Sequence, residues 1–193
     1  MSDQGRARRA DAELNRVRLL DAARAAFSVT GAETSMAEVA RKSGLGSATL
    51  YRNFATRQAL LEALLTDEVN EVCAAAATAE GDTPIERLTA WLRRFYRYVT
   101  EKRPIVLGLL VLEDTDTTNP VFETRARLLA AGRPLLAAAQ AANEIVDELD
   151  LDQILDLVMA IAKITGDRGY KEQILDAGLR GLRRPDAGGD PRT

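Results

Sequence analysis

The stretch from Ser35 to Phe54 reads SMAEVARKSGLGSATLYRNF, and it decides the fold. Ser35 and Glu38 have the S-x-x-E spacing of a capping box, which predicts that a short helix begins here. Gly44 ends that helix, and Ser47 is in position to cap the next one. Two short helices joined by a tight turn are the layout of a helix-turn-helix, whose second helix presents its first residues for reading a DNA groove.

The sequence around this stretch also has helical spacing. Leu19 to Phe27 carries apolar residues at positions i, i+3, i+4, i+7 and i+8 of one helix face, and Gly31 ends the pattern. Thr56 can cap a further helix whose apolar face continues to Val69. No stretch reads as a strand, so we expect an all-α protein. The hairpin geometry alone leaves its role open, because many helical hairpins look alike.

Glycines and prolines divide the rest of the chain. The expected elements are helices over 85–99 and 104–112, a loop over 113–120, a helix over 121–145 that Pro134 kinks or splits, and helices over 151–165 and 170–182. Asp150 and Gln153 have the spacing of a second capping box. We therefore expect a three-helix DNA-binding domain over residues 1–60, a helical ligand-binding and dimerisation domain over 61–184, and disordered segments over 1–13 and 185–193.

The charge of the chain is unevenly distributed. Residues 1–60 hold 10 Lys/Arg and 6 Asp/Glu, a net charge of +4, whereas residues 61–193 hold 16 and 23, a net charge of −7. The two parts sum to the overall −3. A basic first third joined to an acidic remainder is typical of a DNA-binding module attached to a different one. Chance clustering of solvated charges is the other interpretation.

Several classes of protein are disfavoured by composition. The chain has no histidine, which removes the Ser-His-Asp triad, the His-paired cysteine nucleophile and histidine zinc ligands. Carboxylate chemistry stays formally possible, but we expect no enzyme, metal or cofactor. The single cysteine, Cys73, excludes an intrachain disulfide and suits a reducing cytoplasm. Apolar stretches are too short to span a membrane, and Met1 to Arg18 lacks the apolar segment of a secretory signal.

A longer stretch of sequence is a more specific signal of function than the hairpin pattern. Leu19 to Leu65 reads LLDAARAAFSVTGAETSMAEVARKSGLGSATLYRNFATRQALLEALL and resembles the N-terminal DNA-binding domain of the TetR (tetracycline repressor) family. The resemblance is carried by Ala22, Ala23, Phe27, Gly31, the run 35–40, Gly44-Leu45-Gly46, Thr49-Leu50-Tyr51, Phe54 and Ala59-Leu60-Leu61. It covers about a quarter of the chain, and the helical remainder looks like that family's variable C-terminal domain.

We expect phosphate contacts from three residues, two of them implied by the resemblance and one by its place at a helix N-terminus. The family's recognition-helix tyrosine meets a DNA phosphate, which implies that role for Tyr51; the alternative is a core tyrosine packed beside Phe54. Arg57 occupies the position of a phosphate-binding lysine and keeps its charge with a fork of donors. Ser35 stands at a helix N-terminus, a natural phosphate site, and can cap the helix as well.

The remaining candidates for DNA contact lie on the second helix and at the N-terminus. Ser47, Ala48 and Thr49 are the expected base-edge contacts, and because these side chains are short, recognition can also depend on DNA shape. Arg52 is either a phosphate contact or a solvated surface charge. The basic residues Arg6, Arg8 and Arg9 are either a flexible arm along DNA or a disordered solubilising tail.

An aromatic stripe marks the second domain. Its members are Trp91, Phe95, Tyr98, Phe122 and Met159, and they form either ordinary core or a ligand pocket between helices. The resemblance implies a pocket for a small-molecule effector somewhere in this domain. We expect an apolar or aromatic effector, with polar anchors such as Tyr98 or Gln140.

The last two helices carry small residues, namely Ala160, Ala162, Ala177 and Gly178. Such faces predict a homodimer through these two helices, and the family implies a four-helix interface. A two-fold dimer would bind a pseudo-palindromic DNA operator. The leading hypothesis is a repressor released by its ligand. An activator of the same family, and a helical small-molecule-binding protein or enzyme that uses the hairpin only as structure, are the alternatives.

Overall fold

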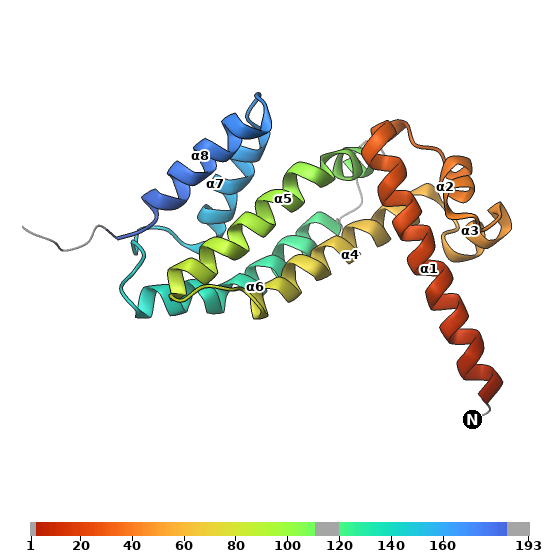
Figure 1. The fold of residues 1–193 in the computed structure, drawn as a ribbon, viewed down its shortest axis with the longest axis horizontal. Coiled ribbons are helices and arrows are strands. Elements are labelled where there is room, and N and C mark those ends of the chain that lie inside the picture. The colour runs from red at the N-terminus through yellow and green to blue at the C-terminus, as the bar shows by residue number, and fades with distance from the viewer. Residues whose placement is uncertain (1–2, 111–119, 185–193) are drawn as a thin grey trace, which may run out of the picture. The chain divides into compact units, whose positions relative to one another are not determined.

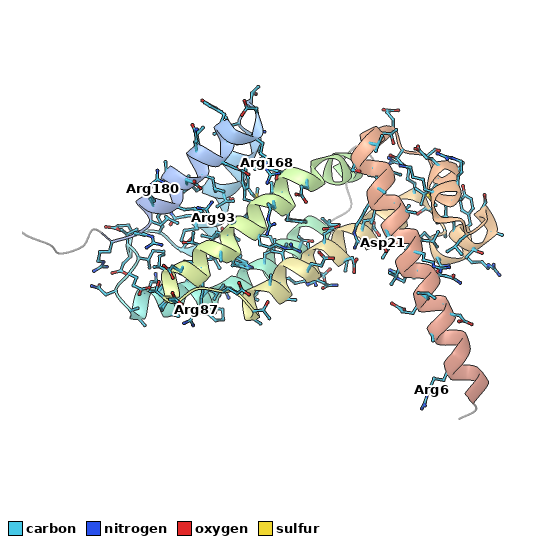
Figure 2. All side chains as sticks on the ribbon, viewed as in Figure 1. Arg6, Asp21, Arg87, Arg93, Arg168 and Arg180 are labelled. Atoms are coloured by element: carbon cyan, nitrogen blue, oxygen red, sulfur yellow. The ribbon has the colours of Figure 1, made fainter. Side chains whose placement is uncertain are left out.

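The structure is a computed structural model, and it describes residues 3–110 and 120–184. The helices of this part are α1 (Asp3–Thr30), α2 (Met36–Ser43), α3 (Ser47–Asn53), α4 (Arg57–Ala77), α5 (Pro84–Leu110), α6 (Pro120–Ala141), α7 (Leu151–Lys163) and α8 (Arg168–Gly181). Figure 1 shows no strand among them, and the described residues hold only an isolated bridge between Ile145 and Arg183. The expected all-α class, with a helix-turn-helix followed by a helical domain, is confirmed.

The chain divides into two compact units. Among the described residues, the N-terminal unit comprises 3–68 with 101–110 and 120, and the C-terminal unit comprises 69–100 with 121–184. Helices α4 and α5 each contribute residues to both units. The domain boundary expected after residue 60 stays a prediction.

The core of the N-terminal unit follows the apolar spacing of the sequence. Leu19, Ala23 and Phe27 of α1 are buried together with Leu50 of α3 and Leu64 of α4. Alanines between the larger residues of α1 let α2 approach closely, and these two helices pack against each other. Figure 1 shows α2 and α3 beside the second half of α1, whose first half extends past them.

Local capping fixes the ends of the short helices. The Ser35 hydroxyl accepts a hydrogen bond from the backbone N–H of Glu38 at 3.2 Å, and Gly44 ends α2 in the left-handed conformation with φ of 68°. The Thr56 hydroxyl accepts from the N–H of Ala59 at 3.0 Å, so the predicted cap of α4 is confirmed. One cap is corrected: Gly46, not Ser47, precedes α3, because the Gly46 carbonyl already accepts the first helical hydrogen bond.

Proline interrupts the helices less than the sequence suggests. Helix α6 continues through Pro134, so of the kink or split expected there the split does not occur, and α5 continues through Pro104 to Leu110. Proline removes one hydrogen bond, but its fixed φ is close to the helical value, so a helix with a packed face can accommodate it. Helix α6 then ends at Ala141, before the 145 expected, and Asn143 follows with φ of 58°.

Two further expectations concern the α7 cap and the segments expected to lack helix. The Asp150–Gln153 capping box is confirmed, with both of its hydrogen bonds present. The disordered segment expected over residues 1–13 is not what the structure shows, because α1 is helical from Asp3. Residues 6–10 are all alanine or arginine, which are strong helix formers, so the helix of the packed part of α1 propagates outward. Most of the loop expected over 113–120, and the tail over 185–193, lie outside the described residues.

Candidate nucleic-acid interface

Helix α3 has one buried side and one exposed side. Leu50 is fully buried, as is Phe54 at the end of the helix. The opposite side carries Ser47, Ala48, Thr49, Tyr51 and Arg52, which we call the α3 face; Thr49 is half-buried and the other four are exposed. The sequence-predicted DNA contacts on this helix therefore lie together on one accessible surface.

Tyr51 is the most prominent apolar group of the α3 face. Its side chain is 54% exposed, which excludes the alternative of a core tyrosine. The core position belongs to Phe54, and the Arg16 guanidinium of α1 lies over the Phe54 ring at 4.8 Å. Tyr51 is thus presented outward while its neighbours anchor α3.

Arg52 and Thr49 form one polar group on the α3 face. The Arg52 Nη2 donates to the Thr49 hydroxyl at 3.1 Å, and its Nε donates to the Ala48 carbonyl at 3.1 Å. Asn53 adds a hydrogen bond from its side-chain amide to the Thr49 carbonyl at 2.8 Å. These hydrogen bonds therefore hold the Arg52 guanidinium along α3.

Arg57 lies at the junction of three helices. Its Nε donates to the Thr34 carbonyl at 3.3 Å, and its guanidinium lies over the Phe27 ring at 5.5 Å. Thr34 immediately precedes Ser35, the N-terminal cap of α2. A cation and the partial positive charge of a helix N-terminus are consequently neighbours here, and both attract anions. The side chain is half-buried, so Arg57 also contributes to packing.

Sequence reasoning missed two basic residues at the end of α2. Lys42 donates from its Nζ to the Ala25 carbonyl at 3.1 Å, which ties α2 to α1. Arg41 is exposed and has no side-chain partner within the described part of the chain. Arg41 and Lys42 lie in the last turn of α2, separated from Gly44 by Ser43, and in the basic first third of the chain. This position is the sequence signal that could have identified them as candidates for DNA contact.

A buried acidic residue joins α1 to α4 within the N-terminal unit. Glu68 is only 7% exposed and accepts a hydrogen bond from Arg24 Nε at 2.7 Å. Arg24 also pairs with Asp67 and Asp21. Burial lowers the pKa of Arg24, but the hydrogen bonds and charges of Glu68 and Asp67 outweigh it and raise the pKa. The sequence carries no signal for the contacts of Arg24 with Asp67 and Glu68, because these residues lie more than 40 positions from Arg24.

Two of the sequence-predicted ligand contacts lie in the core of the C-terminal unit. Trp91 and Phe95 are buried with their rings stacked at 6.4 Å, and Trp91 Nε1 donates to the Val72 carbonyl at 3.0 Å. Tyr98 and Met159 are half-buried, and Phe122 lies outside the residues whose side chains are described. The role of these residues in ligand binding stays a prediction.

The structure has a pocket elsewhere in the C-terminal unit. It lies between the second half of α6 and the first turn of α7, has a volume of about 590 Å³ and includes Gln140 among its lining residues. Among the predicted contacts whose side chains the structure describes, Trp91, Phe95, Tyr98 and Met159 are all absent from its lining. Gln140 is therefore the one polar anchor named from the sequence that this pocket contains.

The small residues of α7 and α8 divide into two groups. Ala162 is buried, and a Cβ added to Gly178 would lie 3.3 Å from Ile161 Cδ1, so both positions serve packing within the chain. Ala160 and Ala177 are exposed, and Tyr170 on α8 is 52% exposed. The latter group forms the outward apolar surface of these helices.

None of the helices described has both the length and the apolarity needed to cross a membrane.

Comparisons with known proteins agree with this architecture. Residues 19–64 match the family described as bacterial regulatory proteins, tetR family, and residues 83–184 match the C-terminal domain described as transcriptional regulator SbtR-like. The second match alone spans more than half of the chain. No functionally curated protein matches the chain.

Solved structures give the same picture. A TetR transcriptional regulator of Streptomyces coelicolor is 34% identical, with 89% of this chain and 99% of that chain covered and a TM-score of 0.73. A TetR regulatory protein of Mycobacterium vanbaalenii is 31% identical, with 91% and 99% covered and a TM-score of 0.73. The regulator KstR2 of Mycobacterium tuberculosis, at 17% identity, 88% and 95% coverage and a TM-score of 0.59, shares the fold.

Proposed function

Because the chain belongs to the TetR family of bacterial transcriptional regulators and is not an enzyme, we propose that it is a dimeric repressor that a small-molecule effector releases from its operator. The observation that carries the proposal is the α3 face, whose residues are exposed apart from the half-buried Thr49, while Leu50 and Phe54 on the other side of the helix are buried in the core. The protein acts in the cytoplasm, where its operator DNA is.

Two kinds of contact are assigned to the N-terminal unit. Tyr51, Arg57 and the capped α2 N-terminus at Ser35 bind phosphates and fix the orientation on the duplex. Ser47, Ala48 and Thr49 meet base edges in the major groove. Arg52 works with Thr49, since the two side chains are already hydrogen-bonded. Arg41, exposed in the last turn of α2, adds a further phosphate contact.

Selective DNA binding tests this function. A labelled duplex taken from the DNA next to the protein's own gene is titrated by fluorescence anisotropy against a scrambled duplex of equal composition. We expect the wild type to prefer the first duplex by about 10³-fold or more. Thr49→Val keeps the shape but removes the hydroxyl that Arg52 contacts, so preference at one base pair per half-site shifts by about 1–3 kcal/mol.

The matched control is Thr66→Val, which removes an exposed hydroxyl on α4 whose only hydrogen bond within the described residues is to the Glu62 carbonyl. It should leave the sequence preference unchanged. Equal affinity of the wild type for both duplexes, or a Thr49→Val variant with wild-type preference, would contradict the assignment.

Dimerisation through α7 and α8 is the second part of the proposal. Ala160, Ala177 and Tyr170 supply a small and apolar outward surface, whose burial is worth about 25 cal/mol per Å². A two-fold dimer would set its two recognition helices about 34–36 Å apart, one turn of DNA. The operator would then be pseudo-palindromic.

Ala177→Glu tests this interface. A carboxylate buried in each half of an apolar interface costs about 3–5 kcal/mol, so we expect a monomer in sedimentation at micromolar concentration. Ala138→Glu, at an exposed alanine of α6, is the control and should remain dimeric. A monomeric wild type, or a dimeric Ala177→Glu variant, would exclude the proposed interface.

Release by an effector is a shift between conformations of the dimer. A ligand that binds better to the conformation with lower operator affinity weakens DNA binding by that difference, typically about 1–3 kcal/mol. Linkage requires that operator DNA weaken effector binding by the same factor. Helix α4, which contributes residues to both units, is the element through which we propose the two sites communicate.

A further inference from the structure

The groove between α6 and α7 has an apolar wall with polar groups at its edge. Helix α6 lines it with Leu129, Arg133, Leu136, Ala137 and Gln140, which share one helix face at spacings i, i+4, i+7, i+8 and i+11. Leu151 of α7 completes the wall, and both it and Leu136 are buried against the core. A volume of about 590 Å³ is in the range of small-molecule sites.

The two carboxylates of the groove are already compensated. Asp150 accepts a hydrogen bond from the N–H of Gln153 at 2.9 Å and lies at the positive end of α7. Asp152 accepts from Arg125 Nε at 2.9 Å and forms an ion pair with the same guanidinium. Neither carboxylate is therefore a strong attractant for a cationic ligand.

Arg133 is the charge of the groove that lacks compensation. Its exposed side chain has no hydrogen bond or ion pair with any residue that the structure describes. By contrast, Arg125 and Arg127 on the same helix are bonded to Asp152 and Asn70, respectively. Gln140, two turns further along α6, is half-buried, and its amide also has no side-chain hydrogen bond within the described residues.

We propose that this groove binds small apolar carboxylates. The forked donors of Arg133 match the two oxygens of a carboxylate, and an apolar body lies along Leu129, Leu136 and Leu151. Gln140, about 10.5 Å from Arg133 along the helix axis, donates to or accepts from a polar group at the other end of the ligand. The site belongs to the C-terminal unit and is separate from the stripe of Trp91 and Phe95.

The protein contains its own reporter for this site. Trp91 is its single tryptophan. A Cβ added to Gly132 would lie 2.4 Å from Trp91 Cη2 and 3.0 Å from Leu151 Cδ2, so the indole lies directly behind the groove, beside the residue that precedes Arg133. Binding against Leu151 is expected to change the tryptophan fluorescence.

In the experiment, the protein is titrated with 4-phenylbutyrate and the fluorescence of Trp91 is recorded. The ligand concentration is raised to about 10 mM, which covers the range in which ligands of this size bind. The matched probes are 4-phenylbutyramide, which is neutral, and 4-phenylbutylamine, which is cationic. We expect the carboxylate to bind about tenfold or more tightly than either. Arg133→Gln should remove this preference, and Arg97→Gln, at an exposed α5 arginine, should keep it.

Thermal unfolding of both variants should match the wild type, since neither arginine has a side-chain partner among the described residues. The inference is overturned if the amine binds as well as the carboxylate, if Arg133→Gln keeps the wild-type affinity, or if no probe binds. Titrations are made without DNA, so failure here leaves the proposed DNA-binding function standing. Failure of the operator titrations would likewise leave the groove site standing.

Discussion

Replacing Leu50 by alanine is expected to lower the free energy of unfolding of the N-terminal unit by about 2–5 kcal/mol. Leu50 is fully buried on the inner side of α3, and Phe54 and the α1 residues Ala23 and Phe27 are also buried in this unit. Truncation of this side chain removes apolar contacts and leaves a cavity, because the surrounding core relaxes only partially. Chemical denaturation followed by circular dichroism measures the change.

The neighbouring variant Tyr51→Ala is the matched comparison. Tyr51 is 54% exposed, so we expect a change in unfolding free energy within about 0.5 kcal/mol, together with a clear loss of operator affinity. The two adjacent residues thus separate folding from DNA contact. Should Tyr51→Ala destabilise the unit as much as Leu50→Ala, the inward and outward sides of α3 have been assigned incorrectly.

Gly132→Ala is expected to be the most damaging small substitution in the C-terminal unit. The added methyl would lie 2.4 Å from Trp91 Cη2 and 2.5 Å from Trp91 Cζ3. The indole cannot easily move, because it is buried and its Nε1 donates to the Val72 carbonyl. Overpacking of this kind costs about 1–3 kcal/mol or more, which exceeds the gain of about 1 kcal/mol from helix propensity.

Thermal unfolding should therefore show a lower midpoint for Gly132→Ala and a blue- or red-shifted Trp91 emission. Gly169→Ala in α8 is the control: its nearest neighbour, Asp167 Oδ1, would be at an ordinary 3.5 Å, so helix propensity should leave the midpoint equal or higher. A Gly132→Ala variant as stable as Gly169→Ala would mean that Trp91 does not pack against α6 as described.

Helix ends were the most predictable feature of the fold. The caps at Ser35, Gly44, Thr56 and Asp150 involve partners within three or four residues, so the sequence spacing contains the whole interaction. The exception is Ser47, where a glycine carbonyl starts α3 one residue earlier. Short-range spacing identifies a cap but does not settle which of two adjacent residues holds it.

Contacts between distant residues were not predictable. Arg57 meets Thr34 across 23 positions, and Arg24 meets Glu68 across 44. The sequence identified Arg57 through its place in a family pattern but gave no sign that it also packs on Phe27. Spacing rules apply within one helix and contain no information on which helices meet.

The aromatic stripe shows a different limit of prediction from sequence. Core and ligand pocket are both apolar, so Trp91 and Phe95 fit either from sequence alone. Burial of both rings and the hydrogen bond of Trp91 to Val72 place them in the core. The groove of Arg133 and Gln140 has the opposite character, since polar residues on an outward helix face look like ordinary surface in the sequence.

The salt dependence of operator affinity tests most directly the claim that the N-terminal unit binds the DNA backbone. It is measured by anisotropy for the wild type, Arg57→Gln and Arg57→Lys, with thermal unfolding as a control for the packing of Arg57 on Phe27. We predict that the slope of log affinity against log salt falls by about 1 in Arg57→Gln and is kept in Arg57→Lys, which retains the charge. An identical slope in the wild type and a folded Arg57→Gln variant would contradict the account.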